Sequence, residues 1–209
     1  MIFWCEKTLF FAIISSMNEL LIKKKKFVVE STLAVHEDHT TYSCVYSGVH
    51  YMVRTYDKDY EQVLADYKTL KHAGINMAKM DFHDDERKII AFDYFPEKDA
   101  LERLAEGPLP EEYFAALFSL YRFARFSKIS LSWEPQNFML RGSQMFYLPH
   151  KVTKLTEENG LEKGGLATWF LGKEGIANLA RKGYDVSKFT PMSEAEVNKA
   201  MTLMAVKYW

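Results

Sequence analysis

One stretch decides how this chain is interpreted: Ser130-Leu131-Ser132-Trp133-Glu134-Pro135-Gln136-Asn137. An apolar segment at 138–140 follows it, then a turn at 141–144 and a second extended segment that ends near His150. This pattern predicts a polar loop that leads into a β-hairpin. The stretch is poor in charge, because Glu134 is its only charged side chain.

The size and composition of the chain set the class of protein. Its 209 residues, of which 48% are hydrophobic, suffice for one medium domain or two small lobes with a real core. The 27 basic and 28 acidic residues nearly cancel, which argues against a dedicated nucleic-acid binder. Cys5 and Cys44 are too few and too far apart for a disulfide framework or a zinc site. We therefore expect a cytoplasmic protein.

The first 26 residues are predicted to form an N-terminal extension, either a helix or a tail. The apolar run at 9–14 is too short to span a bilayer, and Glu6 in its flank disfavours a signal peptide. Either Met1 or Met17 can be the native start, and the sequence leaves both open.

Four consecutive lysines, Lys23, Lys24, Lys25 and Lys26, follow this apolar run. The simplest interpretation is the solvated end of a first helix, where cations suit the helix dipole. The alternative is a weak contact with a membrane surface, because basic runs are attracted to anionic lipid.

The order of the predicted elements indicates an α+β protein with two packed lobes. An N-lobe at 27–95 is predicted to hold an antiparallel sheet and one helix, at 57–71, that Gly74 can end. A smaller and mostly helical C-lobe is predicted at 96–209, with a long helix that Pro110 opens. The predicted strands are 27–35, 41–46, 50–56, about 75–80 and 88–95, and the other predicted helices are 100–106, 166–171, 175–182 and one from Thr190 to the end.

Between residues 27 and 172 the chain resembles the protein kinase superfamily in a degenerate form. The stretch 130–137 has the length of a kinase catalytic loop, with Pro135 and Asn137 in register. Arg54 stands at the position of the phosphate-anchoring lysine, and Asp66 stands where its ion-pair glutamate would be. The resemblance implies a kinase-like fold and, in a competent enzyme, binding of ATP and magnesium.

Two further positions match the kinase pattern in their place along the chain but not in residue type. His150 falls where the metal-binding aspartate should be. Gly165-Leu166-Ala167 resembles the Asp-Leu-Ala segment of small-molecule kinases such as aminoglycoside phosphotransferases, without its aspartate. Imidazole is a poor ligand for Mg²⁺, which prefers oxygen. Under this resemblance Asn137 and His150 are the candidate metal ligands.

The residues that would perform the chemistry depart from the kinase pattern. Ser132 replaces the catalytic aspartate, and a neutral hydroxyl cannot accept the substrate proton as a carboxylate would. Glu134 could act as a substitute base, but it would repel the phosphates. The turn at 36–41, where a glycine-rich phosphate loop is needed, contains no glycine.

Arg54 and Asp66 have two possible roles. They can form a structural ion pair, or, with Asn137, they can hold ATP. The departures together favour a catalytically inactive pseudokinase that acts as a protein-binding or regulatory module, with no cofactor. The alternative is an atypical ATP-dependent phosphotransferase, a bacterial-type small kinase that uses Arg54, Glu134, Asn137 and His150 in altered roles.

Overall fold

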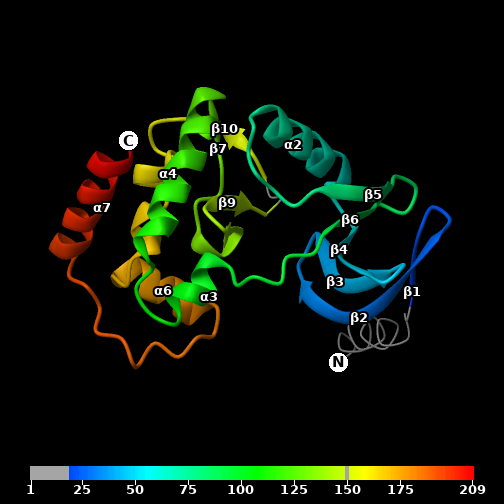
Figure 1. Cartoon of the computed structure of the whole chain (residues 1–209), viewed down its shortest axis with the longest axis horizontal. Helices are drawn as coiled ribbons and strands as arrows, with labels where there is room; N and C mark the ends of the chain where they lie inside the picture. The colour runs from blue at the N-terminus through cyan, green and yellow to red at the C-terminus, as the bar shows by residue number, and fades with distance from the viewer. Residues whose placement is uncertain (1–18, 149–150) are drawn as a thin grey trace, which may run out of the picture. The chain divides into compact units, whose positions relative to one another are not determined.

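The computed structural model describes residues 19–148 and 151–209 (Figure 1). Contacts divide the chain into two compact units. The first unit comprises Met1–Tyr60 and Ala78–Phe95, and the second comprises Glu61–Met77 and Pro96–Trp209. The helix predicted for the N-lobe therefore belongs, from Glu61 onward, to the second unit. The predicted lobe boundaries stay a prediction.

The first unit is a six-stranded antiparallel sheet in the order β1-β2-β3-β4-β6-β5. A two-residue turn at Ser47-Gly48, both with positive φ, joins β3 to β4 as the alternating pattern predicted. One face of the sheet buries a cluster that includes Phe27, Cys44 and Val53. Burial also raises the pKa of the Cys44 thiol to about 12, which makes it an inert core residue. The strands are β1 Glu19–Ile22, β2 Lys25–Val35, β3 His39–Tyr46, β4 Val49–Tyr56, β5 Met80–Asp84 and β6 Ile89–Asp93.

The lysine run does not end a helix, so that prediction is wrong. Lys23 and Lys24 form the turn between β1 and β2, and Lys25 and Lys26 already belong to β2. The ammonium of Lys25 lies 3.9 Å from the centre of the Phe82 ring. Strand pairing with β1, whose Leu20 and Ile22 are buried, overrides the weak local preference of lysine. A membrane-surface contact through these four lysines stays a prediction.

The buried carboxylate of Asp84 ties this turn to the end of β5. Asp84 is only 3% exposed, and it accepts hydrogen bonds from the backbone N–H of Lys23 (2.6 Å) and of Arg87 (3.1 Å). It also accepts one from the Arg87 guanidinium at 3.0 Å. These donors, with the Lys23 N–H first, hold the pKa of Asp84 below its usual range.

Replacing Asp84 by asparagine is expected to lower the free energy of unfolding at pH 7 by about 2–3 kcal/mol, since hydrogen bonds to a buried charge are lost. A lowered pKa in the folded state stabilises the fold above the unfolded pKa, and this contribution is lost as pH falls through the folded pKa. The difference between Asp84→Asn and the wild type should therefore shrink below about pH 4. Urea unfolding at pH 7 and pH 3 measures it, with the exposed Glu86→Gln as the control. A difference that stays constant with pH would contradict the assignment.

The second unit is mostly helical and surrounds one core cluster built on α4. Gly74, at φ +71°, ends α2 as predicted, and the N–H of Ile75 donates to the Leu70 carbonyl in the closing turn. Pro110 caps α4, and two glutamates occupy its first turn. The elements are α2 Tyr60–His72, α3 Ala100–Leu104, α4 Glu111–Phe126, β7 Ile129–Ser130, η1 Pro135–Asn137, β8 Phe138–Arg141, β9 Gln144–Tyr147, β10 Thr153–Lys154, α5 Leu161–Gly164, η2 Leu166–Trp169, α6 Lys173–Arg181 and α7 Glu194–Tyr208.

No helix within the described ranges is long and apolar enough to cross a membrane.

Candidate functional site

The loop at 130–137 is held in the core of the second unit by the indole of Trp133. This side chain is 2% exposed. Its ring stacks on Phe138 with 5.9 Å between centres and meets the edge of Tyr121 at 5.1 Å. The loop therefore carries a large apolar side chain directed inward, where it packs between α4 and β8.

Hydrogen bonds fix the backbone around Trp133. Its Nε1–H donates to the Ser130 hydroxyl (3.2 Å) and to the Asn159 carbonyl (3.1 Å). Its carbonyl accepts from Nε1 of Trp169 at 2.7 Å. Both indole N–H groups are buried and satisfied, so the loop conformation is rigidly specified.

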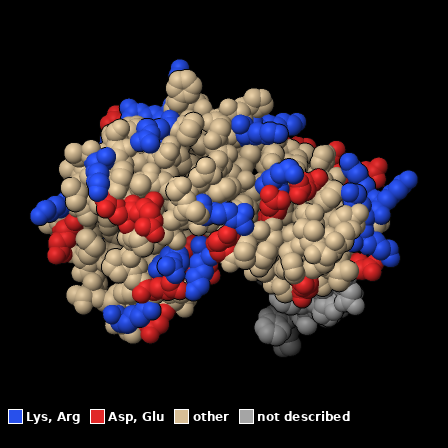
Figure 2. Space-filling view, in the orientation of Figure 1, with Lys and Arg blue, Asp and Glu red and all other residues tan. Residues whose placement is uncertain are grey.

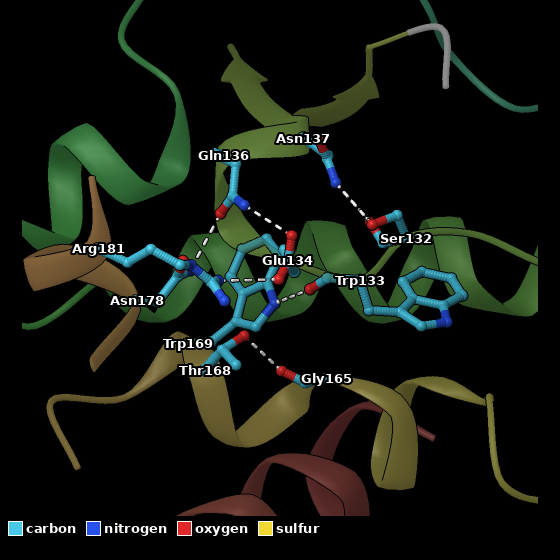
Figure 3. Close-up of polar contacts among 10 residues, drawn as sticks. All are labelled: Ser132, Trp133, Glu134, Gln136, Asn137, Gly165, Thr168, Trp169, Asn178 and Arg181. Atoms are coloured by element: carbon cyan, nitrogen blue, oxygen red, sulfur yellow. Dashed lines mark hydrogen bonds and ion pairs between the residues drawn. The ribbon is translucent and has the colours of Figure 1, made fainter. Parts of the chain in front are cut away.

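Ser132 and Asn137, at the two ends of the turn, are bonded to each other (Figure 3). Nδ2 of Asn137 donates to the Ser132 hydroxyl at 2.9 Å and to the Ser132 carbonyl at 3.1 Å. The Asn137 amide is thus used to close the loop, which leaves its Oδ1 as the one atom that could face a metal.

Glu134 belongs to a closed ring of polar side chains (Figure 3). Its carboxylate accepts from Nε2 of Gln136 at 2.7 Å and from the Arg181 guanidinium at 3.1 Å. Asn178, 2% exposed, donates to Oε1 of Gln136 at 3.0 Å and accepts from Arg181 at 2.7 Å. The charge of Glu134 is therefore balanced by Arg181, and the loop presents no unpaired carboxylate.

Gly165 lies directly against residue 133 of the loop. A Cβ atom at this position would lie 2.6 Å from Cβ of Trp133, closer than real Cβ atoms approach their neighbours. The Gly165 carbonyl accepts the Thr168 hydroxyl at 2.6 Å (Figure 3). The atoms next nearest to that added Cβ are the Trp133 backbone carbon and oxygen, both at 3.2 Å, so the backbone and Cβ of residue 133 leave no room for a side chain at 165.

The other predicted site residues lie in different places. Asp66 is 7% exposed on α2, and its two oxygens accept from Gln62 Nε2 (2.8 Å) and from the backbone N–H of Val152 (3.2 Å). Arg54 lies on β4 in the first unit, with its guanidinium 5.6 Å from the centre of the Phe92 ring. An Arg54–Asp66 pair would join the two units and stays a prediction. His150 lies outside the described residues.

The glycine-free turn is closed by its own side chains. The rings of His36 and His39 stack with 4.5 Å between centres, and the His36 N–H donates to the His39 carbonyl at 2.9 Å. Burial and the nearby charge of Arg54 lower the pKa of His39. Two stacked imidazole rings therefore close this turn.

These contacts limit what the loop can do chemically. Ser132 is neutral, Glu134 is paired, and Asn137 offers one neutral oxygen. Over 19–148 and 151–209 no group of three or more His, Cys, Asp or Glu side chains is gathered for a metal ion. The loop therefore offers a neutral hydroxyl, a paired carboxylate and one amide oxygen, and no free charge.

Sequence reasoning missed the partners of this loop. Asn159, Trp169, Asn178 and Arg181 lie 22 or more residues after Asn137, on elements with no periodic signal linking them to it. The sequence offers one hint that Trp169 is a partner of the loop, because this apolar residue closely follows Gly165-Leu166-Ala167.

No protein-family model matches the sequence, and no curated protein matches it either. Solved structures do match. WaaP in complex with acyl carrier protein is 14% identical with a TM-score of 0.51, over 86% of this chain and 88% of that chain. The PknI kinase domain of Mycobacterium tuberculosis is also 14% identical with a TM-score of 0.52, over 90% and 87%. The predicted α+β, kinase-like fold is confirmed.

Proposed function

We propose that this chain is a catalytically inactive kinase-like domain, a pseudokinase, that acts as a protein-binding or regulatory module. The observation that carries the proposal is the internal bonding of the loop at 130–137. Ser132 and Asn137 hydrogen-bond to each other, and Glu134 pairs with Arg181. A loop whose polar side chains bond chiefly to one another serves as architecture, and its single carboxylate, Glu134, is held by Arg181 instead of being left to orient a substrate hydroxyl.

Two other features support the loss of nucleotide chemistry. The stacked pair of His36 and His39 fills the turn where backbone amides would cradle phosphates. The close approach of Gly165 to Trp133 leaves no space for a metal-binding side chain. Each feature removes a different part of the phosphoryl-transfer mechanism, so restoring one residue would not restore the reaction.

Exposed apolar side chains support a protein as the partner. Phe126 at the end of α4 is 90% exposed, and Val206 on α7 is 80% exposed. The opposite face of α7, with Met201, Met204 and Tyr208, packs on the core of the second unit. Contiguous exposed apolar side chains mark interaction surfaces, and Leu203 and Val206 line one open hollow on α7.

Thermal unfolding with millimolar ATP, with and without Mg²⁺ or Mn²⁺, tests the proposal. We expect the melting temperature to move by less than about 1 °C. A nucleotide at a hundred times its Kd would stabilise the fold by about 2.7 kcal/mol, which corresponds to roughly 5–10 °C for a chain of this size. A metal-dependent shift of that size, lost in Arg54→Ala, would support the alternative of an atypical phosphotransferase.

Transfer of labelled phosphate from ATP to the chain itself or to a general acceptor protein provides an independent readout. We expect no transfer above background. Transfer that disappears in both Arg54→Ala and Asn137→Ala would overturn the pseudokinase proposal.

A further inference from the structure

An open pocket of about 340 Å³ lies in the second unit, between the C-terminal ends of α2 and α4. We call it the basic pocket. Its lining residues are Lys68, Thr69, His72, Ala73, Ser127 and Ile129. Its size falls within the range of small-molecule sites, and most of its lining side chains can form hydrogen bonds.

Three further lysines flank the basic pocket. Lys128 lies between two of the lining residues, and Lys154 is the strand partner of Ile129 in the pairing of β10 with β7. Lys151 precedes Val152, whose N–H is bonded to Asp66 on α2. All three are exposed, as is Lys68, and Figure 2 shows basic side chains over α2.

The positive charge of these lysines is not balanced locally. None of Lys68, Lys128 and the other flanking lysines forms an ion pair with any residue that the structure describes. Asp66 on α2 does not balance them, because it is buried and both of its oxygens are occupied by donors. Uncompensated like charges around a concave surface concentrate anions there.

The helix dipoles give a second explanation for basic residues at these positions, because cations suit helix C-termini. The last carbonyls of α2 are already bonded, however. The Lys71 carbonyl accepts from the Gly74 N–H at 3.2 Å, and the Leu70 carbonyl accepts from the Ile75 N–H at 3.1 Å. A macrodipole is worth about half a charge at each end, so two helix ends cannot balance four lysines.

The donors around the basic pocket match phosphate oxygens. Lysine binds phosphate as a point charge, and the Ser127 hydroxyl can add a neutral hydrogen bond. The other two polar side chains of the lining are already used as donors, because Nδ1 of His72 donates to the Lys68 carbonyl at 2.7 Å and the Thr69 hydroxyl donates to the Ala65 carbonyl at 3.0 Å. We propose that the basic pocket binds a phosphate-bearing small ligand or headgroup, held chiefly by Lys68 and Ser127 of its lining and by Lys128 beside it. This site is separate from the loop at 130–137 and does not depend on the proposed function.

Calorimetric titration of the full chain with tripolyphosphate, in low-salt buffer, tests this inference. We expect saturable binding at one site that weakens as NaCl is raised to 0.5 M. Lys68→Gln/Lys128→Gln should lower the affinity at least tenfold. The matched control is Lys23→Gln/Lys24→Gln, which removes the same charge from two exposed lysines of the first unit and should change the affinity less than twofold.

Equal losses in both variants would show that only net charge matters and would overturn the proposal. Absence of binding at millimolar tripolyphosphate, in solution and with vesicles alike, would also overturn it. Binding of an RNA homopolymer without binding of tripolyphosphate would replace the proposed ligand class with nucleic acid.

Vesicles of phosphatidylcholine with 10% phosphatidic acid distinguish a lipid headgroup from a free phosphate. Sedimentation with these vesicles, lost in Lys68→Gln/Lys128→Gln, would identify the headgroup as the ligand. Binding of tripolyphosphate alone would identify a soluble ligand. A shift with ATP that survives Arg54→Ala but is lost in Lys68→Gln belongs to the basic pocket, which separates this inference from the test of nucleotide chemistry.

Discussion

Replacing Trp133 by alanine is expected to lower the free energy of unfolding by about 4 kcal/mol, since truncating a buried aromatic side chain costs 3–5 kcal/mol. The indole is 2% exposed and contacts Phe138 and Tyr121. Its removal leaves a cavity and also leaves the Asn159 carbonyl without the Nε1–H donor. Urea unfolding followed by far-UV circular dichroism measures the change.

Trp133→Phe provides the matched comparison, because it keeps an aromatic ring and removes only the Nε1–H and part of the volume. We expect it to cost about 1–2 kcal/mol, close to the value of one or two buried hydrogen bonds. If Trp133→Ala cost less than about 2 kcal/mol, the indole would not anchor the loop.

Gly175→Ala is expected to destabilise the second unit by about 3 kcal/mol although alanine is the better helix former. A Cβ atom at this position in α6 would lie 1.9 Å from the Phe170 carbonyl oxygen. Helix propensity favours alanine over glycine by about 1 kcal/mol, whereas overpacking against rigid backbone costs about 1–3 kcal/mol or more. With an overlap this severe we expect the overpacking cost to exceed about 3 kcal/mol. This cost outweighs the gain in helix propensity, so the net effect of Gly175→Ala on the free energy of unfolding is destabilising.

The same substitution should disturb the loop at 130–137, because α6 carries Asn178 and Arg181. Ala177→Ser, on an exposed position of the same helix, is the control and should change the free energy of unfolding by less than about 0.5 kcal/mol. A stabilising effect of Gly175→Ala would mean that α6 does not approach Phe170 as closely as the structure has it.

Local signals predicted most of the fold. The alternation in 39–56 with Ser47-Gly48, the stop at Gly74 and the start at Pro110 depend on neighbouring residues alone. The sequence did not indicate strand β1, because lysines are typical of a helix end and uncommon in strands. The turn after β1 is held only by the pairing of β1 with β2 and by the Asp84 carboxylate. Contacts of that kind have no local signature.

From the sequence, only the part of the candidate site that lies in one continuous stretch could be predicted. The loop itself and its shortage of charge are evident from Ser132 to Asn137, and the structure places these two side chains in contact. The bonds from Trp169, Asn178 and Arg181 to this loop span 36 to 47 residues, so no spacing rule could indicate them. The pseudokinase function stays a proposal.

The bond between the Lys23 N–H and Asp84 has a consequence for assembly. In the strand order of the first unit, β1 and β5 are the two outer strands, and they contact each other through this bond. Outer strands with unpaired backbone groups are templates on which another chain can add a strand and aggregate. By drawing the ends of both strands together, the Asp84 carboxylate limits access to these templates. Loss of Asp84 should therefore expose the sheet to self-association as well as weaken it.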